Sequence, residues 1–147
     1  MHKKWHEAKY IPYFQAHTNT YAPASVLRER FEPVLKQDNV VGISIATRAD
    51  CLEDDVLDYL SELNERTYLV TELGLQTVFD ETGEKINRCH TYAEFLDGYK
   101  KLQDRNINVC VHLIDGLPGE TTDMMLESAK AVAKLNPHCV KLHLLHV

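Results

Sequence analysis

The segment from Leu113 to Thr121, with the sequence LIDGLPGET, has residue types and spacing suited to binding a ligand. It leaves a predicted strand and enters a predicted helix. Gly116 and Gly119 permit a positive φ or a close backbone approach, and the N-terminus of the following helix offers free N–H groups. The segment is a candidate binding loop. The alternative is a tight strand-to-helix turn that binds nothing.

A second candidate consists of Glu72, Gly74 and Gln76, which share one face of a predicted strand. The glycine between two polar side chains leaves room for a ligand. Arg88 follows Gln76 by 12 residues, and its guanidinium group suits a carboxylate. The alternative is a buried Glu72–Arg88 ion pair, with Gln76 hydrogen-bonded to the backbone.

A third candidate is the polar loop Tyr13–Pro23, which follows the first predicted strand and includes Gln15, Thr18 and Asn19. In α/β proteins, ligands bind to loops at the carboxyl ends of strands. The alternative is a surface loop closed by side-chain-to-backbone turns.

Alternating strands and helices must position these three segments. Strands are predicted at 9–14, 40–45, 68–73, 108–114 and 139–145, and helices at 23–36, 54–66, 77–87, 91–105 and 122–135. Most intervals are about the ~30 residues of a βαβ unit, which implies right-handed crossovers and a parallel sheet. No linker or break in composition divides the chain, so residues 1–147 are predicted to form a single domain.

The later strands have one aliphatic face and one mixed or polar face. The aliphatic residues, including Val140, Leu142 and Leu144 of the last strand, are expected to pack on helices. The opposite faces carry Ser44, Arg48, Glu72, Gln76, His112, Lys141 and His143. A core filled only for stability would not collect such groups. The pattern favours a curved sheet or partial barrel with a polar lumen over a flat, doubly wound sheet. A (β/α)8 barrel needs ~250 residues, so this chain provides part of a barrel or a smaller one.

The composition is that of a globular protein. The chain has 147 residues, 44% of them hydrophobic, and a formal net charge of −6. The acidic balance argues against a chain built mainly to grip nucleic-acid phosphates. No apolar run approaches the ~18 residues of a membrane helix. Met1–Glu7 lacks the hydrophobic stretch of a secretory signal, so a cytoplasmic location is expected.

The cysteines and histidines do not form a metal-binding motif. Four cysteines stand far apart without a C-x-x-C pair, at Cys51, Cys89, Cys110 and Cys139. They are expected to be reduced thiols rather than a zinc knuckle or a self-contained iron–sulfur motif. The pair His2 and His6, and the pair His143 and His146, are interpreted as surface residues, so no metal ligands are assigned.

The ordered set of motifs resembles the radical S-adenosylmethionine (radical SAM) superfamily, and most closely its YhcC-type iron–sulfur oxidoreductase branch. The matching segments are Tyr13–Pro23, Gly42–Cys51, Glu72–Thr77 with Ile86–Arg88, Gly116–Thr121 and Lys141–Val147. The resemblance implies a parallel-stranded, TIM-like (β/α)6 partial barrel, of which this chain would supply about five βα units without strand one. In that family SAM lies across the carboxyl ends of the strands. Three cysteines after strand one hold a [4Fe–4S] cluster, and electron transfer cleaves SAM to methionine and a 5′-deoxyadenosyl radical.

The resemblance also implies roles for individual residues. The loop with Gln15, Thr18 and Asn19 takes the place of a glycine-rich segment that meets the methionine amino group, although it is not glycine-rich here. Glu72, Gly74 and Gln76 match the E-x-G-x-Q form of the catalytic subunit of Elongator. In oxygen-independent coproporphyrinogen oxidases, the residues that match Gln76 and Arg88 contact the ribose and carboxylate of SAM.

The adenine-side motif G-x-I-x-G-x-x-x-E is matched by Ile114, Gly116 and Glu120. His112 replaces its first glycine, where those oxidases carry a ribose-binding acid. The predicted cofactor-binding set is completed by residues of the concave face, Ser44, Arg48 and His143. No catalytic residue is assigned within this chain.

The family's cluster-binding cysteines precede the first strand seen here, and the sequence given begins at Met1. The chain is therefore expected to be an inactive core fragment that binds SAM weakly, with the [4Fe–4S] cluster confined to a full-length oxidoreductase or transferase. The edge of the sheet near Lys9 is expected to mediate homo-oligomers. The likeness to Elongator suggests RNA, with a tRNA wobble base as substrate. The alternative is a non-catalytic α/β binding or interaction module.

Overall fold

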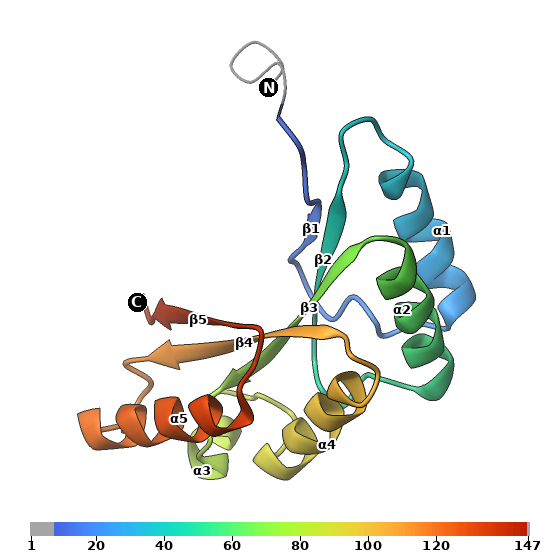
Figure 1. Cartoon of the computed structure of the whole chain (residues 1–147). Coiled ribbons are helices and arrows are strands. Elements are labelled where there is room, and N and C mark those ends of the chain that lie inside the picture. The colour runs from blue at the N-terminus through green and yellow to red at the C-terminus, as the bar shows by residue number, and fades with distance from the viewer. Residues whose placement is uncertain (1–7, 147) are drawn as a thin grey trace.

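The computed structural model describes residues 8–146, which form a five-stranded parallel sheet with helices. In chain order the elements are β1 (Tyr13–Phe14), α1 (Ala24–Leu35), β2 (Gly42–Thr47), α2 (Asp54–Arg66), β3 (Tyr68–Gln76), α3 (Asp80–Lys85), α4 (Tyr92–Gln103), β4 (Asn108–Asp115), α5 (Thr122–Leu135) and β5 (Cys139–Leu144). Neighbouring strands follow sequence order from β1 to β5. The strands turn progressively across the sheet, and the helices lie on its convex side (Figure 1).

This architecture confirms the predicted partial α/β barrel. A doubly wound sheet would carry helices on both faces and reverse its strand order at a switch point. Here the order never reverses, and the concave side between β1 and β5 carries no helix of the described residues (Figure 1). The concave side is therefore free to hold a ligand.

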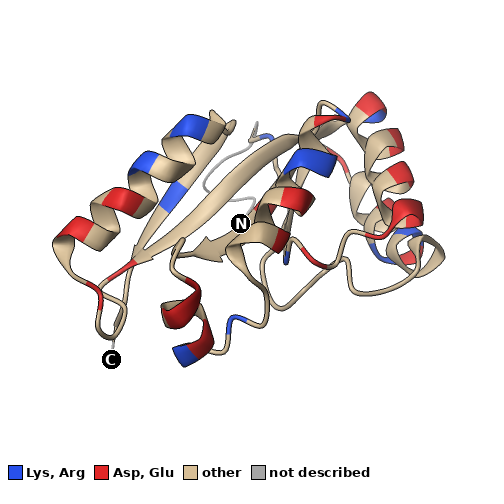
Figure 2. Cartoon of the chain, turned by 90° about the horizontal axis from the view of Figure 1, so that it is seen from below, with Lys and Arg blue, Asp and Glu red and all other residues tan. Residues whose placement is uncertain are grey.

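The core lies between the convex face of the sheet and the helices. Ile43, Ile45, Leu69 and Leu73 are fully buried on this face, and the helices that cover it carry many of the charged residues (Figure 2). Because successive side chains of a strand alternate in direction, the intervening residues face the concave side. The alternation predicted from the sequence is confirmed for β2, β3 and β4.

The last strand departs from the prediction. Val140, Leu142 and Leu144 are 43%, 63% and 70% exposed, so the expectation that they pack on a helix is wrong. The preceding helix, α5, contacts β4, and no helix within residues 8–146 covers the outer face of β5. None of the helices in that range has both the length and the apolar character needed to cross a membrane.

Local signals determine where several elements begin and end. Thr91 and Glu94 form a capping box at the start of α4, since each side chain bonds the other's backbone N–H. At the end of α5, Asn136 adopts a left-handed conformation that terminates the helix. The predicted first strand shrinks to two residues plus an isolated bridge between Tyr10 and Val40.

Candidate functional site

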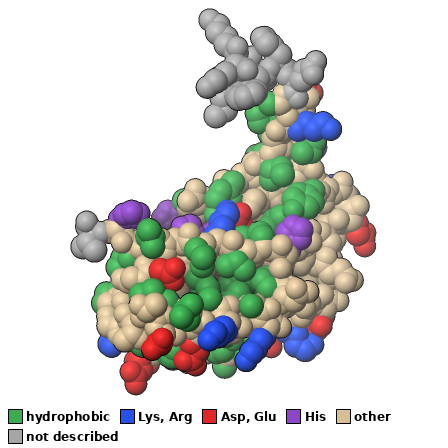
Figure 3. Space-filling view, turned by 60° about the vertical axis from the view of Figure 1, so that its left-hand side comes forward, with side chains coloured by type: hydrophobic (Ala, Val, Ile, Leu, Met, Phe, Trp, Pro, Cys, Tyr) green, Lys and Arg blue, Asp and Glu red, His purple; other side chains and the backbone are tan. Residues whose placement is uncertain are grey.

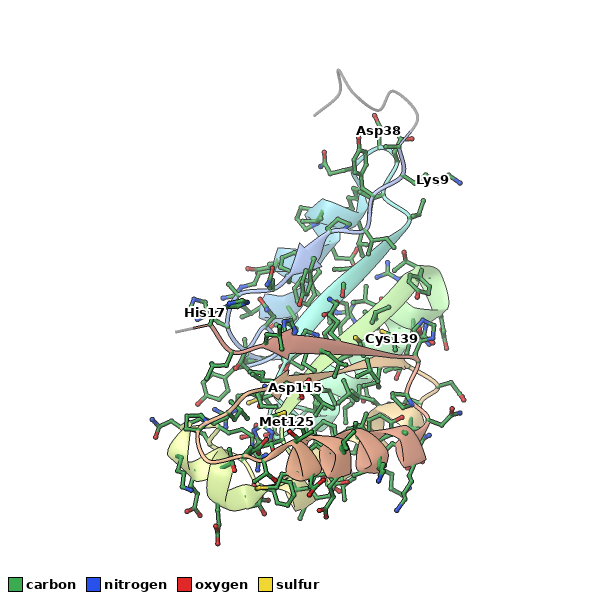
Figure 4. All side chains as sticks on the ribbon, turned by 90° about the vertical axis from the view of Figure 1, so that its left-hand side faces the viewer. Lys9, His17, Asp38, Asp115, Met125 and Cys139 are labelled. Carbon is green, nitrogen blue, oxygen red and sulfur yellow. The ribbon has the colours of Figure 1, made fainter. Side chains whose placement is uncertain are left out.

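A cavity of about 530 Å³ opens on the concave face. Its volume is within the range of small-molecule sites. Nine of the residues predicted to bind the cofactor line it, namely Gln15, Thr18, Arg48, Glu72, Gln76, Arg88, His112, Ile114 and His143. Histidines gather on this face around a basic and an acidic side chain (Figure 3). One of the lining loops carries His17, which lies at the end of the molecule toward which β5 points, away from Cys139 (Figure 4).

Glu72 is the centre of a polar network on the floor of the cavity. Its side chain is only 6% exposed and faces away from the helices, opposite Leu73 and Leu75. Lys141 Nζ donates to Glu72 Oε2 at 2.5 Å, and Ser44 Oγ donates to the other carboxylate oxygen. The alternative Glu72–Arg88 ion pair is wrong, because the cation beside Glu72 is Lys141 from β5.

These contacts determine the charge state of Glu72. Burial alone would raise the pKa of the carboxyl group, but the hydrogen bonds that it accepts outweigh burial and lower the pKa to about 2. The donors are Lys141, Ser44, Tyr13 and His112. Lys141 Nζ also lies 4.4 Å from the ring centroid of Tyr13, which is a cation–π contact. The network therefore holds an ionised carboxylate together with a cation.

Two histidines extend the network into the cavity. Nε2 of His112 lies 2.6 Å from Glu72 Oε2, and Nδ1 of His112 lies 3.2 Å from Nε2 of His143. Burial lowers the pKa of His112, although Glu72 acts in the opposite direction. In the strand register His112 lies opposite Lys141 and His143 lies opposite Ile114, so His112 and His143 are diagonal neighbours across β4 and β5.

Arg88 is held by the protein itself. Its side chain is 2% exposed, and Nη2 donates to Asp80 at 2.5 Å. Nε and Nη1 donate to three backbone carbonyl oxygens, those of His90, Leu75 and Thr77. These bonds close the irregular turn after β3, where Gln76 has a φ of 63°. Arg88 thus borders the cavity mainly as the group that holds this turn.

The space beside Gly74 is also occupied from within the chain. A Cβ atom at Gly74 would collide with Nε2 of Gln76. The amide of Gln76 therefore lies over the glycine, in the space that the sequence suggested for a ligand. Because Gln76 lines the cavity, its amide is positioned to meet a ligand there.

Four of the predicted residues do not line the cavity but belong to the segments around it, namely Asn19, Ser44, Gly116 and Glu120. Asn19 Nδ2 donates to the carbonyl oxygens of Phe14 and Ala46, both at 2.9 Å, and ties the polar loop to the sheet. Ser44 supports Glu72. Glu120 accepts from Thr77 Oγ1 at 2.5 Å, and Gly116 has a φ of 85°.

The structure adds lining residues that the sequence-based set lacked. They include Tyr13, His17 and His90. His17 belongs to the polar loop singled out by its composition, so that loop was the available signal. His90 lies between elements, where no periodicity indicates the direction of a side chain. Its Nε2 is buried and lacks a hydrogen-bond partner among residues 8–146, which is costly unless a bound group supplies one.

The described residues do not fit a [4Fe–4S] cluster. Cys110 is buried, Cys51 is half-buried, and Cys89 and Cys139 are exposed. Only Cys110 and Cys139 are neighbours, across β4 and β5, so three thiolates do not converge within residues 8–146. The four cysteines of the described residues therefore do not provide a cluster site.

One group of potential metal ligands occurs in the described residues, formed by Glu72, Cys110 and His112 within 4.8 Å of one another. Lys141 already neutralises the carboxylate, and burial, with a contribution from neighbouring Cys139, raises the pKa of Cys110 to about 12. The thiol therefore stays protonated, and we assign no metal. His2 and His6 lie outside the described residues.

Comparison with known proteins identifies relatives of this chain. The chain is 61% identical over all 147 residues to YtqA of Bacillus subtilis, covering 46% of that protein. It is 41% identical over 140 residues to YhcC of Escherichia coli, covering 95% of the chain and 45% of that protein. The tRNA uridine(34) acetyltransferase of Methanocaldococcus jannaschii is 27% identical over 106 residues, which are 70% of the chain and 19% of that protein. The chain thus spans less than half the length of the curated relatives it matches.

A solved structure gives the same result for the fold. Coproporphyrinogen III oxidase of Escherichia coli, described as a radical SAM enzyme, matches with a TM-score of 0.70 and 25% identity over 88% of this chain and 30% of that one. The model of the Radical SAM superfamily matches residues 3–132. The resemblance inferred from the motifs is confirmed, and the chain belongs to the radical SAM superfamily.

Proposed function

We propose that this chain supplies the SAM-binding half of a radical SAM enzyme that acts on RNA. The observation that carries the proposal is the cavity at the carboxyl ends of the strands, which nine of the predicted cofactor residues line. When bound next to a reduced cluster, SAM supplies a 5′-deoxyadenosyl radical that abstracts hydrogen from a substrate. The cluster, and the part of the substrate site that lies beyond this cavity, would belong to the remainder of a full-length protein.

The lining residues suit the separate parts of SAM. Ile114 and Leu117 provide an apolar surface for adenine. Gln76 offers hydrogen-bonding groups to the ribose hydroxyls, and Gln15 and Thr18 offer them to the methionine end. The unpartnered Nε2 of His90 provides a further acceptor beside the cavity. In this proposal Arg88 acts mainly by holding the turn, since four of its hydrogen bonds stay within the chain.

RNA is proposed as the substrate class because the chain resembles a tRNA uridine(34) acetyltransferase over 70% of its length. A chain with a net charge of −6 is poorly suited to bind the phosphates of RNA. We therefore assign the phosphate contacts to the remainder of the full-length protein. Anisotropy of a labelled tRNA anticodon hairpin with full-length protein should reveal binding that a DNA hairpin of equal length lacks. Equal binding of both hairpins would contradict an RNA substrate.

SAM binding is tested directly on this chain. Without the iron that chelates methionine, the affinity should be about millimolar, or ~4 kcal/mol. Amide NMR spectra titrated with SAM should move signals of the lining residues, and Gln76→Ala should weaken the binding several-fold. Gln103→Ala, at an exposed position of α4 that does not line the cavity, is the matched control. A folded chain whose cavity signals stay unmoved at millimolar SAM would refute the proposal and favour a non-catalytic α/β module.

We also propose that copies of the chain associate through the sheet edge at β1. This edge strand pairs with β2 alone, and Ile11, Tyr13 and Val41 beside it are 47%, 37% and 42% exposed. Unpaired edges and exposed apolar residues favour association. Sedimentation equilibrium should show a dimer or larger species that Ile11→Lys weakens. A monomer at high concentration would contradict this proposal.

A further inference from the structure

The row Glu72–His112–His143 crosses three neighbouring strands and ends at the cavity wall. Glu72 stands on β3, His112 on β4 and His143 on β5. The contacts are 2.6 Å from Glu72 Oε2 to His112 Nε2 and 3.2 Å from His112 Nδ1 to His143 Nε2. The two imidazole ring centroids lie 5.0 Å apart. The row therefore connects a buried carboxylate to a side chain that lines the cavity.

The geometry determines which nitrogen carries each proton. An ionised carboxylate only accepts, so His112 Nε2 must be the donor toward Glu72. Lys141 Nζ already provides the positive charge at the same oxygen, so no imidazolium is needed to balance it. A neutral His112 protonated on Nε2 has a lone pair on Nδ1. His143 Nε2 must then donate to that lone pair, which leaves Nδ1 of a neutral His143 as an acceptor.

We propose that His143 Nδ1 is a proton acceptor of this cavity, and that Glu72 orients it through His112. The matching ligand class is a substrate group with an exchangeable N–H or O–H proton. No hydrogen bond within residues 8–146 reaches His143 Nδ1, and the residue lines the cavity. The inference rests on the proposed function only in taking this cavity as the place where substrate reacts.

The proton transfer balances within this arrangement. The bond from the substrate nitrogen or oxygen to hydrogen breaks, its electron pair stays on the substrate atom, and the proton forms a bond to His143 Nδ1. The resulting imidazolium donates more strongly to His112 Nδ1, and the carboxylate of Glu72 lies one ring further along. The ammonium group of Lys141 opposes a positive charge on His112, whereas the carboxylate of Glu72 favours it.

Other charged and titratable groups face the row from each neighbouring element. They are Tyr13 on β1, Cys110 on β4, Lys141 on β5, and His17, Arg48, Arg88 and His90 on the loops that line the cavity. Arg48 is paired with Asp50 and Arg88 with Asp80. His17 and His90 share the cavity with His143, so the imidazole signals of these three histidines must be assigned individually.

The experiment measures imidazole ¹⁵N signals of the labelled chain at about pH 8, above the ordinary histidine pKa. Both His112 and His143 should be single Nε2–H tautomers, with a scalar coupling across the hydrogen bond between His143 Nε2 and His112 Nδ1. His112→Phe should abolish the coupling and return His143 to a tautomer mixture. His138, which bonds Tyr68 on another part of the surface, is the internal control and should not change.

The wild-type spectrum alone decides the question, even if the variant fails to fold. A His143 protonated on Nδ1, or the absence of the coupling in a well-dispersed spectrum, would overturn the proposal. Neither result depends on SAM. Failure of the proposed role of His143 is therefore distinguishable from failure of the proposed function, which the SAM titration tests separately.

Discussion

Replacing Glu72 with glutamine should reduce stability at neutral pH and leave it unchanged in acid. The substitution keeps the shape of the side chain and removes the charge that Lys141 Nζ contacts at 2.5 Å. Because the Glu72 side chain is 6% exposed, solvent screens this interaction little. Lys141 is 41% exposed, so its ammonium group can be solvated in the variant and the chain should still fold.

The magnitude follows from the pKa of Glu72, which falls from an ordinary value of 4.5 to about 2 in the folded chain. A depressed carboxyl pKa stabilises the fold above the unfolded-state value, and this contribution is lost as the pH falls through the folded-state value. At 1.36 kcal/mol per pKa unit, the difference corresponds to about 3 kcal/mol. The contribution should be fully present above about pH 5 and absent below about pH 2.

The assay is urea unfolding followed by circular dichroism at several pH values between neutral and acid. Wild type should exceed Glu72→Gln by about 2–3 kcal/mol in free energy of unfolding at neutral pH, and the two curves should converge in acid. Glu29→Gln, on the exposed face of α1, is the matched control and should run parallel to wild type. A deficit of constant size at every pH would refute the role of the charge and indicate a packing defect instead.

Three further substitutions test how the chain holds the cavity, each by urea unfolding. Arg88→Lys should cost about 2–3 kcal/mol, because one ammonium group cannot serve three buried carbonyls and a carboxylate; an unchanged midpoint would contradict this. Gly98→Ala should cost about 2 kcal/mol or more, since its Cβ would collide with the carbonyl oxygen of Ala49, and a gain in stability would disprove that contact. Thr91→Ala should cost about 1 kcal/mol by breaking the capping box with Glu94, and a neutral effect would show that the cap is dispensable.

The direction of the side chains within a strand could be predicted from the sequence because it is a local property. Alternation along a strand places Ser44, Glu72 and His112 opposite the aliphatic residues that pack on the helices. The same rule identified the polar face of β5. It could not predict that Val140 and Leu142 would be exposed, since exposure depends on whether another element covers the face. Local periodicity carries no information about that.

The partners of the charged residues could not be predicted, because they depend on curvature and register across several strands. Glu72 and Lys141 are 69 residues apart in the sequence, and the curved sheet brings these side chains of β3 and β5 together across β4. The hydrogen-bond partners of Arg88 could not be predicted either. Its spacing from Gln76 indicated that it could reach the site, but the positive φ at Gln76 turns backbone carbonyls toward it. A guanidinium group with five donors satisfies those carbonyls and Asp80 at once. The motif thus identified a residue that holds the turn beside the cavity, with its donors directed to the chain itself.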